Sequence, residues 1–268
     1  MPELPEVETI RRDLAPLLEG RRITRVTEAL ADPHYRNLIE AVGRSIRRLR
    51  RRGKYMIAEL GDRELVMHLG MTGQVGVMPQ VPPTLRHVHV TFELDNREVF
   101  FFNDQRRFGY LMLVPAGDYA AIPTLAAMGP EPLEPDFAFE PFARAMAHAK
   151  TLKPLLLSQR PVAGLGNIYV DEALHRAKLH PERGALTRAE ARRLYDAIRE
   201  VLATGIQNRG TTFKDYRDGM GRYGTNQEFL WAFDQEGKPC RHCGTPIEKT
   251  RVGNRGTYLC PCCQRAKR

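Results

Sequence analysis

The C-terminal part of the chain carries cysteines at the spacing of a metal site. Cys240 and Cys243 form one Cys-x2-Cys pair, and Cys260 and Cys263 form a second pair after 16 intervening residues. Two such pairs bring four thiolates around one Zn²⁺, and four protein ligands leave no coordination position for water. We therefore predict one structural zinc ion; a redox-active or incidental set of cysteines is the alternative. The fifth cysteine, Cys262, could replace Cys263, although the spacing favours Cys263.

The N-terminal residues place an amine beside a carboxylate. Proline is small enough for Met1 to be removed, which leaves Pro2 with a free secondary amine. An α-amine titrates near about 7.7–8.0, so part of it is unprotonated and nucleophilic at neutral pH. Glu3 and Glu6 supply carboxylates close by. Taken alone, these residues are more typical of a capped helix start than of a catalytic site.

Positive charge is concentrated in two regions of the chain. The sequence has 41 Lys and Arg against 32 Asp and Glu, a formal net charge of +9. Residues 44–54 include seven basic side chains and no acid, and Lys249, Arg251 and Arg255 lie between the cysteine pairs. This density indicates a nucleic acid that both regions contact, with a solvated basic surface as the alternative. Charge alone does not distinguish DNA from RNA.

The elements that position these groups change character along the chain. Apolar residues recur at helical spacing over about 5–19, and short alternating runs from 23 to 114 predict a β-sandwich. A Pro-rich stretch over 129–135 suits a linker. Helices are predicted at 139–150, 152–159, 168–177 and 187–207, followed by a long loop over 211–237.

These patterns predict an α+β multidomain protein. We expect a β-sandwich domain with an N-terminal helix over 1–132, a helical domain over 133–228 and a zinc finger over 229–268. No stretch of the sequence approaches the length of about 20 apolar residues that a membrane span needs, and the acidic N-terminus is unlike a signal peptide. We therefore expect a monomeric protein of the cytoplasm.

Taken together, the motifs closely resemble the formamidopyrimidine-DNA glycosylase family, bacterial enzymes that excise 8-oxoguanine and ring-opened purines. The resemblance runs from Pro2 to Cys263 in ordered blocks. These blocks are Pro2-Glu3-Leu4-Pro5-Glu6-Val7-Glu8-Thr9, Gly53-Lys54, His68-Leu69-Gly70-Met71-Thr72-Gly73, Arg106-Arg107-Phe108-Gly109, Gly164-Leu165-Gly166-Asn167-Ile168-Tyr169 with Glu172, and the four cysteines.

The resemblance implies a β-sandwich, a helix-two-turn-helix domain and a zinc finger that bind double-stranded DNA containing an oxidised base. It implies that Pro2 attacks the deoxyribose C1′, that Glu3 is the general acid and base, and that β and δ eliminations then cut the strand. It further implies that Met71, Arg106 and Phe108 fill the void left by the extruded base. The matching catalytic positions are Pro2, Glu3, Lys54 and Arg255, and the matching DNA-binding positions are His89, Arg106, Met71, Phe108, Asn167 and Glu172.

Two departures and two alternatives qualify this interpretation. Many relatives have proline where this chain has Gln105, and the loop over 212–228, which matches the lesion-recognition position, differs from the common pattern. An endonuclease VIII-type enzyme for oxidised pyrimidines is one alternative, and a catalytically silent damage-binding zinc protein is the other. Pro2, Glu3 and Lys54 together argue against the silent binder.

Overall fold

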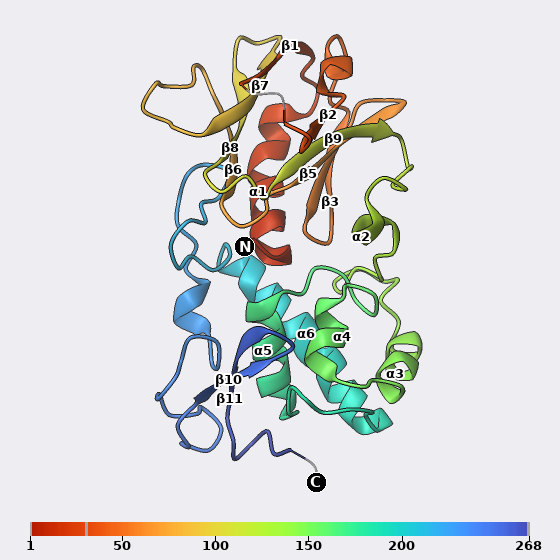
Figure 1. The fold of residues 1–268 in the computed structure, drawn as a ribbon, viewed down its shortest axis with the longest axis vertical. Coiled ribbons are helices and arrows are strands. Elements are labelled where there is room, and N and C mark those ends of the chain that lie inside the picture. The colour runs from red at the N-terminus through yellow and green to blue at the C-terminus, as the bar shows by residue number, and fades with distance from the viewer. Residues whose placement is uncertain (1, 30–31, 267–268) are drawn as a thin grey trace. The chain divides into compact units, whose positions relative to one another are not determined.

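The computed structural model describes residues 2–29 and 32–266, so the predicted removal of Met1 falls outside the described residues. The chain divides into two compact units (Figure 1). The first unit consists of Met1–Ala126 and Arg209–Thr225, and the second of Ala127–Asn208 and Asn226–Arg268. The cysteine-rich tail therefore shares a compact unit with the helices, whereas part of the long loop belongs with the strands. The three-domain division follows sequence pattern rather than compactness, and it stays a prediction.

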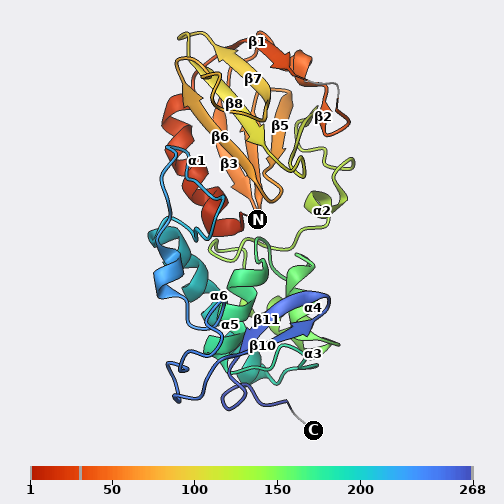
Figure 2. The ribbon, with the colours of Figure 1, turned by 60° about the vertical axis from the view of Figure 1, so that its left-hand side comes forward.

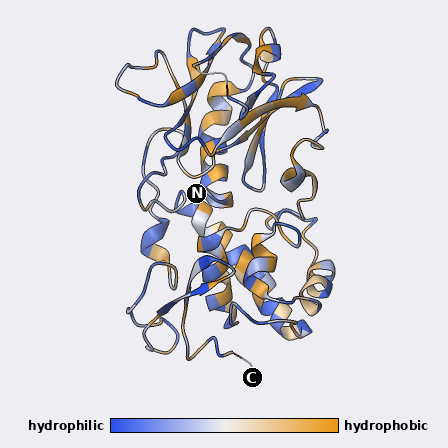
Figure 3. Cartoon of the chain, in the orientation of Figure 1, coloured by the Kyte–Doolittle hydropathy of each residue, from blue (hydrophilic) through white to orange (hydrophobic). Residues whose placement is uncertain are grey.

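Helix α1 (Leu4–Leu18) opens the first unit and confirms the helix predicted near 5–19. Glu3 is its N-cap, and the backbone N–H of Glu3 donates to Oε2 of Glu6 at 2.8 Å, one half of a capping box. Pro5 sits in the first turn, where its missing N–H removes no helical hydrogen bond. Hydrophilic and hydrophobic residues alternate around the helix (Figure 3). The buried apolar side chains recur at helical spacing: Val7, Ile10, Leu14 and Leu18.

Two β-sheets whose strands are mostly antiparallel follow α1, as the alternating pattern predicts. One has the strand order β1-β7-β8-β6 and the other the order β2-β9-β5-β4-β3. The first sheet comprises β1 (Ile23–Glu28), β6 (Gly73–Met78), β7 (Val88–Leu94) and β8 (Val99–Asp104). The second comprises β2 (Tyr35–Arg36), β3 (Arg48–Arg52), β4 (Tyr55–Glu59), β5 (Arg63–His68) and β9 (Tyr110–Pro115), with η1 (Leu38–Ala41) and α2 (Pro123–Ala126) outside the sheets.

The two sheets and α1 share one hydrophobic core. Leu65 and Met67 of β5, Phe92 of β7 and Phe100 of β8 belong to the same buried cluster as Ile10 of α1. Helix α1 packs against β3 and β6, which are edge strands of the two sheets, and Figure 2 shows it running along one side of them. A helix over two edges covers backbone groups that would otherwise be exposed. The β-sandwich with an N-terminal helix is confirmed.

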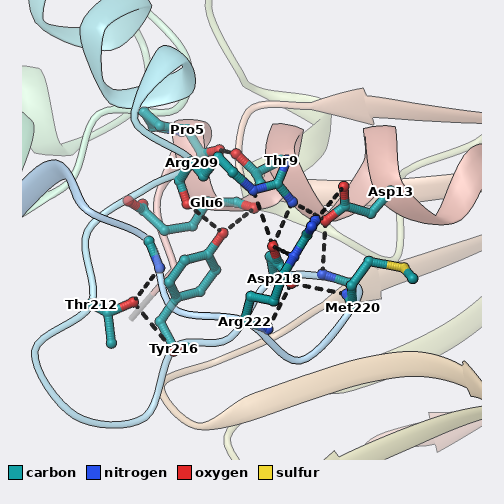
Figure 4. A network of polar contacts seen from close by, with 12 residues as sticks. Pro5, Glu6, Thr9, Asp13, Arg209, Thr212, Tyr216, Asp218, Met220 and Arg222 are labelled. Carbon is teal, nitrogen blue, oxygen red and sulfur yellow. Dashed lines mark hydrogen bonds and ion pairs between the residues drawn. The ribbon is translucent and has the colours of Figure 1, made fainter.

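The segment 209–225 is an ordered loop packed on α1 through charged side chains (Figure 4). Arg209 donates to Oδ2 of Asp13 at 2.6 Å and also pairs with Asp218, whose side chain is fully buried. Arg222 reaches the same carboxylate of Asp218 at 3.0 Å. Because these charges neutralise one another, the loop can lie against the helix without a secondary structure of its own.

The second unit is helical and confirms the helices predicted from periodicity. Helix α6 begins after Thr187, whose side chain accepts from the backbone N–H of Glu190 in a capping box, and it packs on α5. None of the helices in the described part of the chain is long and apolar enough to cross a membrane. The elements are α3 (Phe139–Ala147), α4 (Leu152–Leu157), α5 (Asn167–Ala177), α6 (Arg188–Gln207), η2 (Asn226–Phe229), β10 (Glu248–Val252) and β11 (Arg255–Leu259).

The Pro-rich stretch predicted as a linker is a packed part of the second unit. The N–H of Gly129 donates to the carbonyl of Gln159 at 2.8 Å, and the carbonyl of Pro130 accepts from the N–H of Ala163 at 2.9 Å. The guanidinium of Arg199 donates to the carbonyl of Pro132 at 2.8 Å. The stretch is thus held by the N–H of Gly129 and by the carbonyls of Pro130 and Pro132. The segment predicted as a linker is therefore ordered and packed within the second unit.

Candidate active site and DNA-binding surface

The predicted nucleophile and acid stand directly before α1. Pro2 and Glu3 are both buried, and Glu3 is only 3% exposed. The link between Glu3 and Glu6 fixes the direction in which the chain enters the helix. Carboxylates are favoured at a helix N-terminus, and here Glu3 and Glu6 form the capping box.

Glu6 ties this end of the helix to the loop 209–225. Its side chain is 1% exposed; Oε2 accepts from the N–H of Glu3, and Oε1 accepts from the N–H of Thr211 at 2.7 Å. The hydroxyl of Tyr216 donates to the carbonyl of Arg209 at 3.1 Å and stands beside the helix (Figure 4). One buried carboxylate thus connects the predicted catalytic end of α1 with the loop.

Lys54 lies in the turn between β3 and β4 and is 8% exposed. Helix α1 packs against both strands, so Lys54 belongs to the same unit as Pro2 and Glu3. Burial and the positive charge of Lys54 lower the pKa of His68 to about 4. The N–H of Gly70 donates to Nδ1 of His68 at 3.2 Å, as a neutral ring requires. His68 is therefore uncharged at neutral pH.

The three predicted void-filling side chains are accessible. Met71 is 41% exposed and Phe108 is 52% exposed, and the Cζ atom of Arg106 lies 4.7 Å from the centroid of the Phe108 ring. These side chains are therefore not part of the core and are accessible to a partner.

His89, which the resemblance gives as a DNA contact, is placed inside the first unit. It is 5% exposed, and its Nε2 lies 2.8 Å from the carbonyl oxygen of Asp104. Its ring also stacks on that of Tyr35, with 6.1 Å between centroids. In this structure the side chain of His89 supports the end of β8 and is not on the surface.

In the second unit, Asn167 and Arg255, two of the positions that match family site residues, meet at the tip of a β-hairpin. Asn167 begins α5, and its Nδ2 donates to the carbonyl of Gly256 at 2.9 Å. Arg255 precedes Gly256 at the start of β11 and is exposed. The structure therefore places Asn167 next to the backbone that carries Arg255, and it leaves the guanidinium accessible to an anion.

A buried ion pair behind this hairpin was not predicted. Nζ of Lys153 donates to Oδ1 of Asp171 at 2.6 Å, to the carbonyl of Gly256 at 3.0 Å and to the hydroxyl of Thr257 at 2.8 Å. The other carboxylate oxygen of Asp171 accepts from the N–H of Tyr258 at 3.0 Å. The sequence held one signal of this pair, a lysine inside the apolar run 152–157.

Glu172, which the resemblance gives as a DNA-binding position, is buried in the second unit. It is 2% exposed, and its carboxylate accepts from the backbone N–H groups of Trp231, Ala232 and Phe233 at 2.8–3.0 Å. In the structure this carboxylate holds the segment that leads into the cysteine pairs, and a role at the DNA stays a prediction.

The four cysteines of the two pairs are brought together. Their sulfur atoms all lie within 4.8 Å of one another, with 4.0 Å between Cys240 and Cys263 and 3.5 Å between Cys243 and Cys260. Tetrahedral zinc with Zn–S bonds of about 2.3 Å separates its sulfurs by about 3.8 Å, so these residues fit the ion. Among the described residues Cys262 is exposed and does not belong to the cluster.

The basic stretch 44–54 is partly neutralised by acids of the same unit. Arg50 donates to Glu59 at 2.9 Å and to Glu64 at 2.8 Å, and Arg51 donates to Glu8 at 3.1 Å. Arg44 pairs with Asp62. Folding therefore brings acids that are distant in sequence to part of this stretch.

Comparison with known proteins defines the class. Three family models match in order: the formamidopyrimidine-DNA glycosylase N-terminal domain over residues 1–111, the corresponding H2TH domain over 128–217, and the zinc finger found in FPG and IleRS over 237–266. This set of domains, with cysteines that fit one structural zinc ion, defines a DNA glycosylase with apurinic/apyrimidinic lyase activity.

The chain belongs to the formamidopyrimidine-DNA glycosylase family. It is 48% identical to the formamidopyrimidine-DNA glycosylase of Deinococcus radiodurans, over 98% of this chain and 97% of that one. The crystal structure of the MutM (Fpg) protein of Thermus thermophilus superposes with a TM-score of 0.90 at 48% identity, covering 98% of each chain. A Lactococcus lactis Fpg variant in complex with Fapy-dG-containing DNA gives a TM-score of 0.91 at 34% identity, covering 99% of this chain and 100% of that one.

Proposed function

We propose that the protein excises 8-oxoguanine and formamidopyrimidines from duplex DNA and cuts the strand through a covalent intermediate on Pro2. The observation that carries the proposal is the N-terminus, where Pro2 adjoins Glu3 at the start of α1 and Glu6 fixes the backbone between them. The substrate class is supported by relatives solved with DNA that contains Fapy-dG or carbocyclic 8-oxo-G.

The chemistry follows from a secondary amine beside a carboxylic acid. The nitrogen of Pro2 forms a bond to C1′ as the C1′–N bond to the base breaks, and the base leaves with a proton. Glu3 protonates O4′ as the sugar ring opens, which gives a cationic iminium. The iminium accepts electrons when a C2′ proton is lost and the 3′ phosphate leaves; a second elimination then releases the 5′ phosphate.

Basic side chains of the two units hold the anionic groups of this reaction. Lys54 stabilises negative charge near the lesion, and Asn167 and Arg255 hold the phosphates that flank it. The hydrogen bond from Asn167 to Gly256 supports this role, because it fixes the hairpin tip from which Arg255 projects. The zinc ion stabilises the fold of that hairpin and takes no part in bond breaking.

Extrusion of the damaged base requires residues that replace it in the stack. Met71 and Phe108 are exposed apolar side chains that wedge between bases, and Arg106 hydrogen-bonds the unpaired partner base. His89 and Glu172 are buried and hydrogen-bonded within their own units, so we assign them positioning roles rather than direct contacts. The relatives named above are bacterial, which supports a bacterial, cytoplasmic enzyme.

The test is covalent trapping on a defined duplex. The protein is incubated with a duplex carrying 8-oxoguanine opposite cytosine, with and without borohydride, as wild type and as Pro2→Gly. We expect a trapped protein–DNA adduct with borohydride, and a gap with phosphate at both ends without it. Both signals should be strongly weakened in the Pro2→Gly variant, whose primary amine replaces the ring nitrogen of proline.

Two outcomes would contradict the proposal in different ways. Salt-sensitive binding of the lesion duplex without an adduct would indicate a silent damage binder. Adduct formation on thymine glycol but not on 8-oxoguanine would indicate an enzyme of the endonuclease VIII type.

A further inference from the structure

The two loops that carry the void-filling side chains meet at one buried carboxylate. Asp104 ends β8, and its side chain is fully inaccessible. Oδ2 accepts from the backbone N–H of Gly109 at 2.7 Å, and Oδ1 accepts from the N–H of Arg106 at 3.2 Å. Both ends of the loop that presents Phe108 are thus hydrogen-bonded to the same side chain.

Thr72 connects this carboxylate to the other loop. It follows Met71 directly and is 8% exposed. Its hydroxyl donates to Oδ1 of Asp104 at 2.5 Å and accepts from the N–H of Arg106 at 3.1 Å. A hydroxyl that donates one bond and accepts another orders both partners at once. The backbone that carries Met71 is therefore linked to the backbone that carries Arg106.

The backbones of the loops also touch. Gly70 has φ +57°, and a Cβ atom placed on it would lie 2.5 Å from the N of Gly109 and from the carbonyl carbon of Phe108. A Cβ on Gly109 would lie 2.7 Å from the ring of Phe102. Only glycine fits such approaches, so the backbone at Gly70 contacts that of Phe108 and Gly109 directly, and Gly109 lies directly on β8.

The backbone of Asp104 is held as well as its side chain. Its N–H donates to the carbonyl of His87 at 3.0 Å, and its carbonyl oxygen faces Nε2 of His89 at 2.8 Å. A buried charge that is hydrogen-bonded on every side specifies one arrangement of its neighbours, because breaking any bond leaves a buried polar group unpaired.

We infer that Asp104 and Thr72 are positioning residues that join the loops 69–73 and 105–109 into one rigid wedge, so that Met71, Arg106 and Phe108 enter DNA together. The inference rests on the void-filling role in the proposed function. A wedge that is ordered before binding avoids the entropy loss of ordering three side chains at the moment of insertion. Thr72 and Asp104 contribute without touching DNA.

The test is a double-mutant cycle between the wedge residues. 2-Aminopurine beside the lesion reports base unstacking in stopped-flow fluorescence, and the rate is measured for Met71→Ala, Phe108→Ala and the double variant. In the wild-type background we expect the two effects on the logarithm of the unstacking rate to be non-additive. The second truncation should add less than about half of the effect that it has alone, because one truncation already prevents joint insertion. In a Thr72→Val background we expect the effects to become additive.

Thr72→Val removes the hydroxyl at nearly constant size, and by itself it should slow unstacking about tenfold, which is about 1.4 kcal/mol of barrier. Thr72→Ser should restore the wild-type rate and non-additivity. The matched control is Thr27→Val on an exposed face of β1, which should change neither the unstacking rate nor the non-additivity. Unfolding midpoints are measured for each variant, so that loss of folding is recognised directly.

Three results would overturn the inference and leave the proposed function standing. Additive effects in the wild-type background would show that the loops insert independently. Non-additivity that persists in Thr72→Val would show that the coupling does not run through Thr72. A Thr72→Ser variant as slow as Thr72→Val would show that the methyl packing matters and not the hydroxyl. If Met71→Ala and Phe108→Ala both leave the unstacking rate unchanged, the void-filling role in the proposed function is wrong. The inference, which rests on that role, is then wrong too.

Discussion

Lys153 and Asp171 form an ion pair with 2.6 Å between Nζ and Oδ1, and both side chains are wholly inaccessible. Burial raises the pKa of Asp171, and the Lys153 ammonium opposes that rise. The pair joins α4 to α5 and reaches the hairpin at Gly256 and Tyr258. The ion pair therefore also links α4 and α5 to β11, the strand that begins with Arg255.

Removing one partner of this pair should be strongly destabilising. Asp171→Leu leaves the ammonium of Lys153 buried without a counter-charge, and we expect a loss of about 3–5 kcal/mol in the free energy of unfolding. Lys153→Met with Asp171→Leu should lose less than the sum of the single changes, because no charge is left unpaired. Urea denaturation of the three variants measures this. Additive losses would show that the two charges do not interact.

Acid should weaken the contact between α1 and β3. Burial raises the pKa of Glu8, but hydrogen bonds from Arg11 and Arg12 and the charge of Arg51 outweigh it and hold that pKa at about 2. Because the folded pKa lies below the unfolded value, the ionised Glu8 stabilises the fold above about pH 4.5, and this contribution is lost as the pH falls towards 2.

Replacing Glu8 with glutamine should therefore matter more at neutral pH than in acid. We expect the stability difference between wild type and Glu8→Gln to shrink by on the order of 1–2 kcal/mol from pH 6 to pH 3. Urea midpoints at the two pH values measure the change. A difference that does not vary with pH would contradict the coupling to ionisation.

Zinc removal should be visible through Trp231, the single tryptophan of the sequence. The centroid of its ring lies 5.3 Å from that of His242, a residue between Cys240 and Cys243 in the sequence. Its backbone N–H donates to the carboxylate of Glu172. A chelator should change the tryptophan fluorescence, release one equivalent of zinc and abolish DNA binding. Cys243→Ser should have the same effect, whereas Cys262→Ser should retain zinc. Loss of zinc from Cys262→Ser would contradict the assigned ligand set.

The basic residues should divide into those that bind DNA and those that stabilise the fold. Arg255→Gln should reduce the slope of log affinity against log salt by about 1, as expected when one phosphate contact is lost. Arg50→Gln should leave that slope unchanged and lower the unfolding midpoint, because Arg50 is paired with Glu59 and Glu64. Fluorescence anisotropy at several salt concentrations, with denaturation in parallel, separates the two. Equal slopes for both variants would contradict the division.

The sequence alone determined the features that depend on local spacing. The cysteine pairs at 240–243 and 260–263 predicted the zinc site, because each pair fits in one turn and needs no distant partner. The helices near 139–207 were predicted because apolar residues every three or four positions mark one buried face. The sandwich followed from the alternation of short strands.

The partner that each polar side chain takes depends on the folded arrangement of the chain. Thr72 and Asp104 are 32 residues apart, and Arg51 and Glu8 are 43 apart, so no local pattern connects them. The sequence gives the type of a side chain, but strand register and loop path decide whether its partner is water, DNA or protein. The resemblance gives Glu172 and His89 as DNA-binding positions, and only the structure shows that both are buried and hydrogen-bonded within their own units.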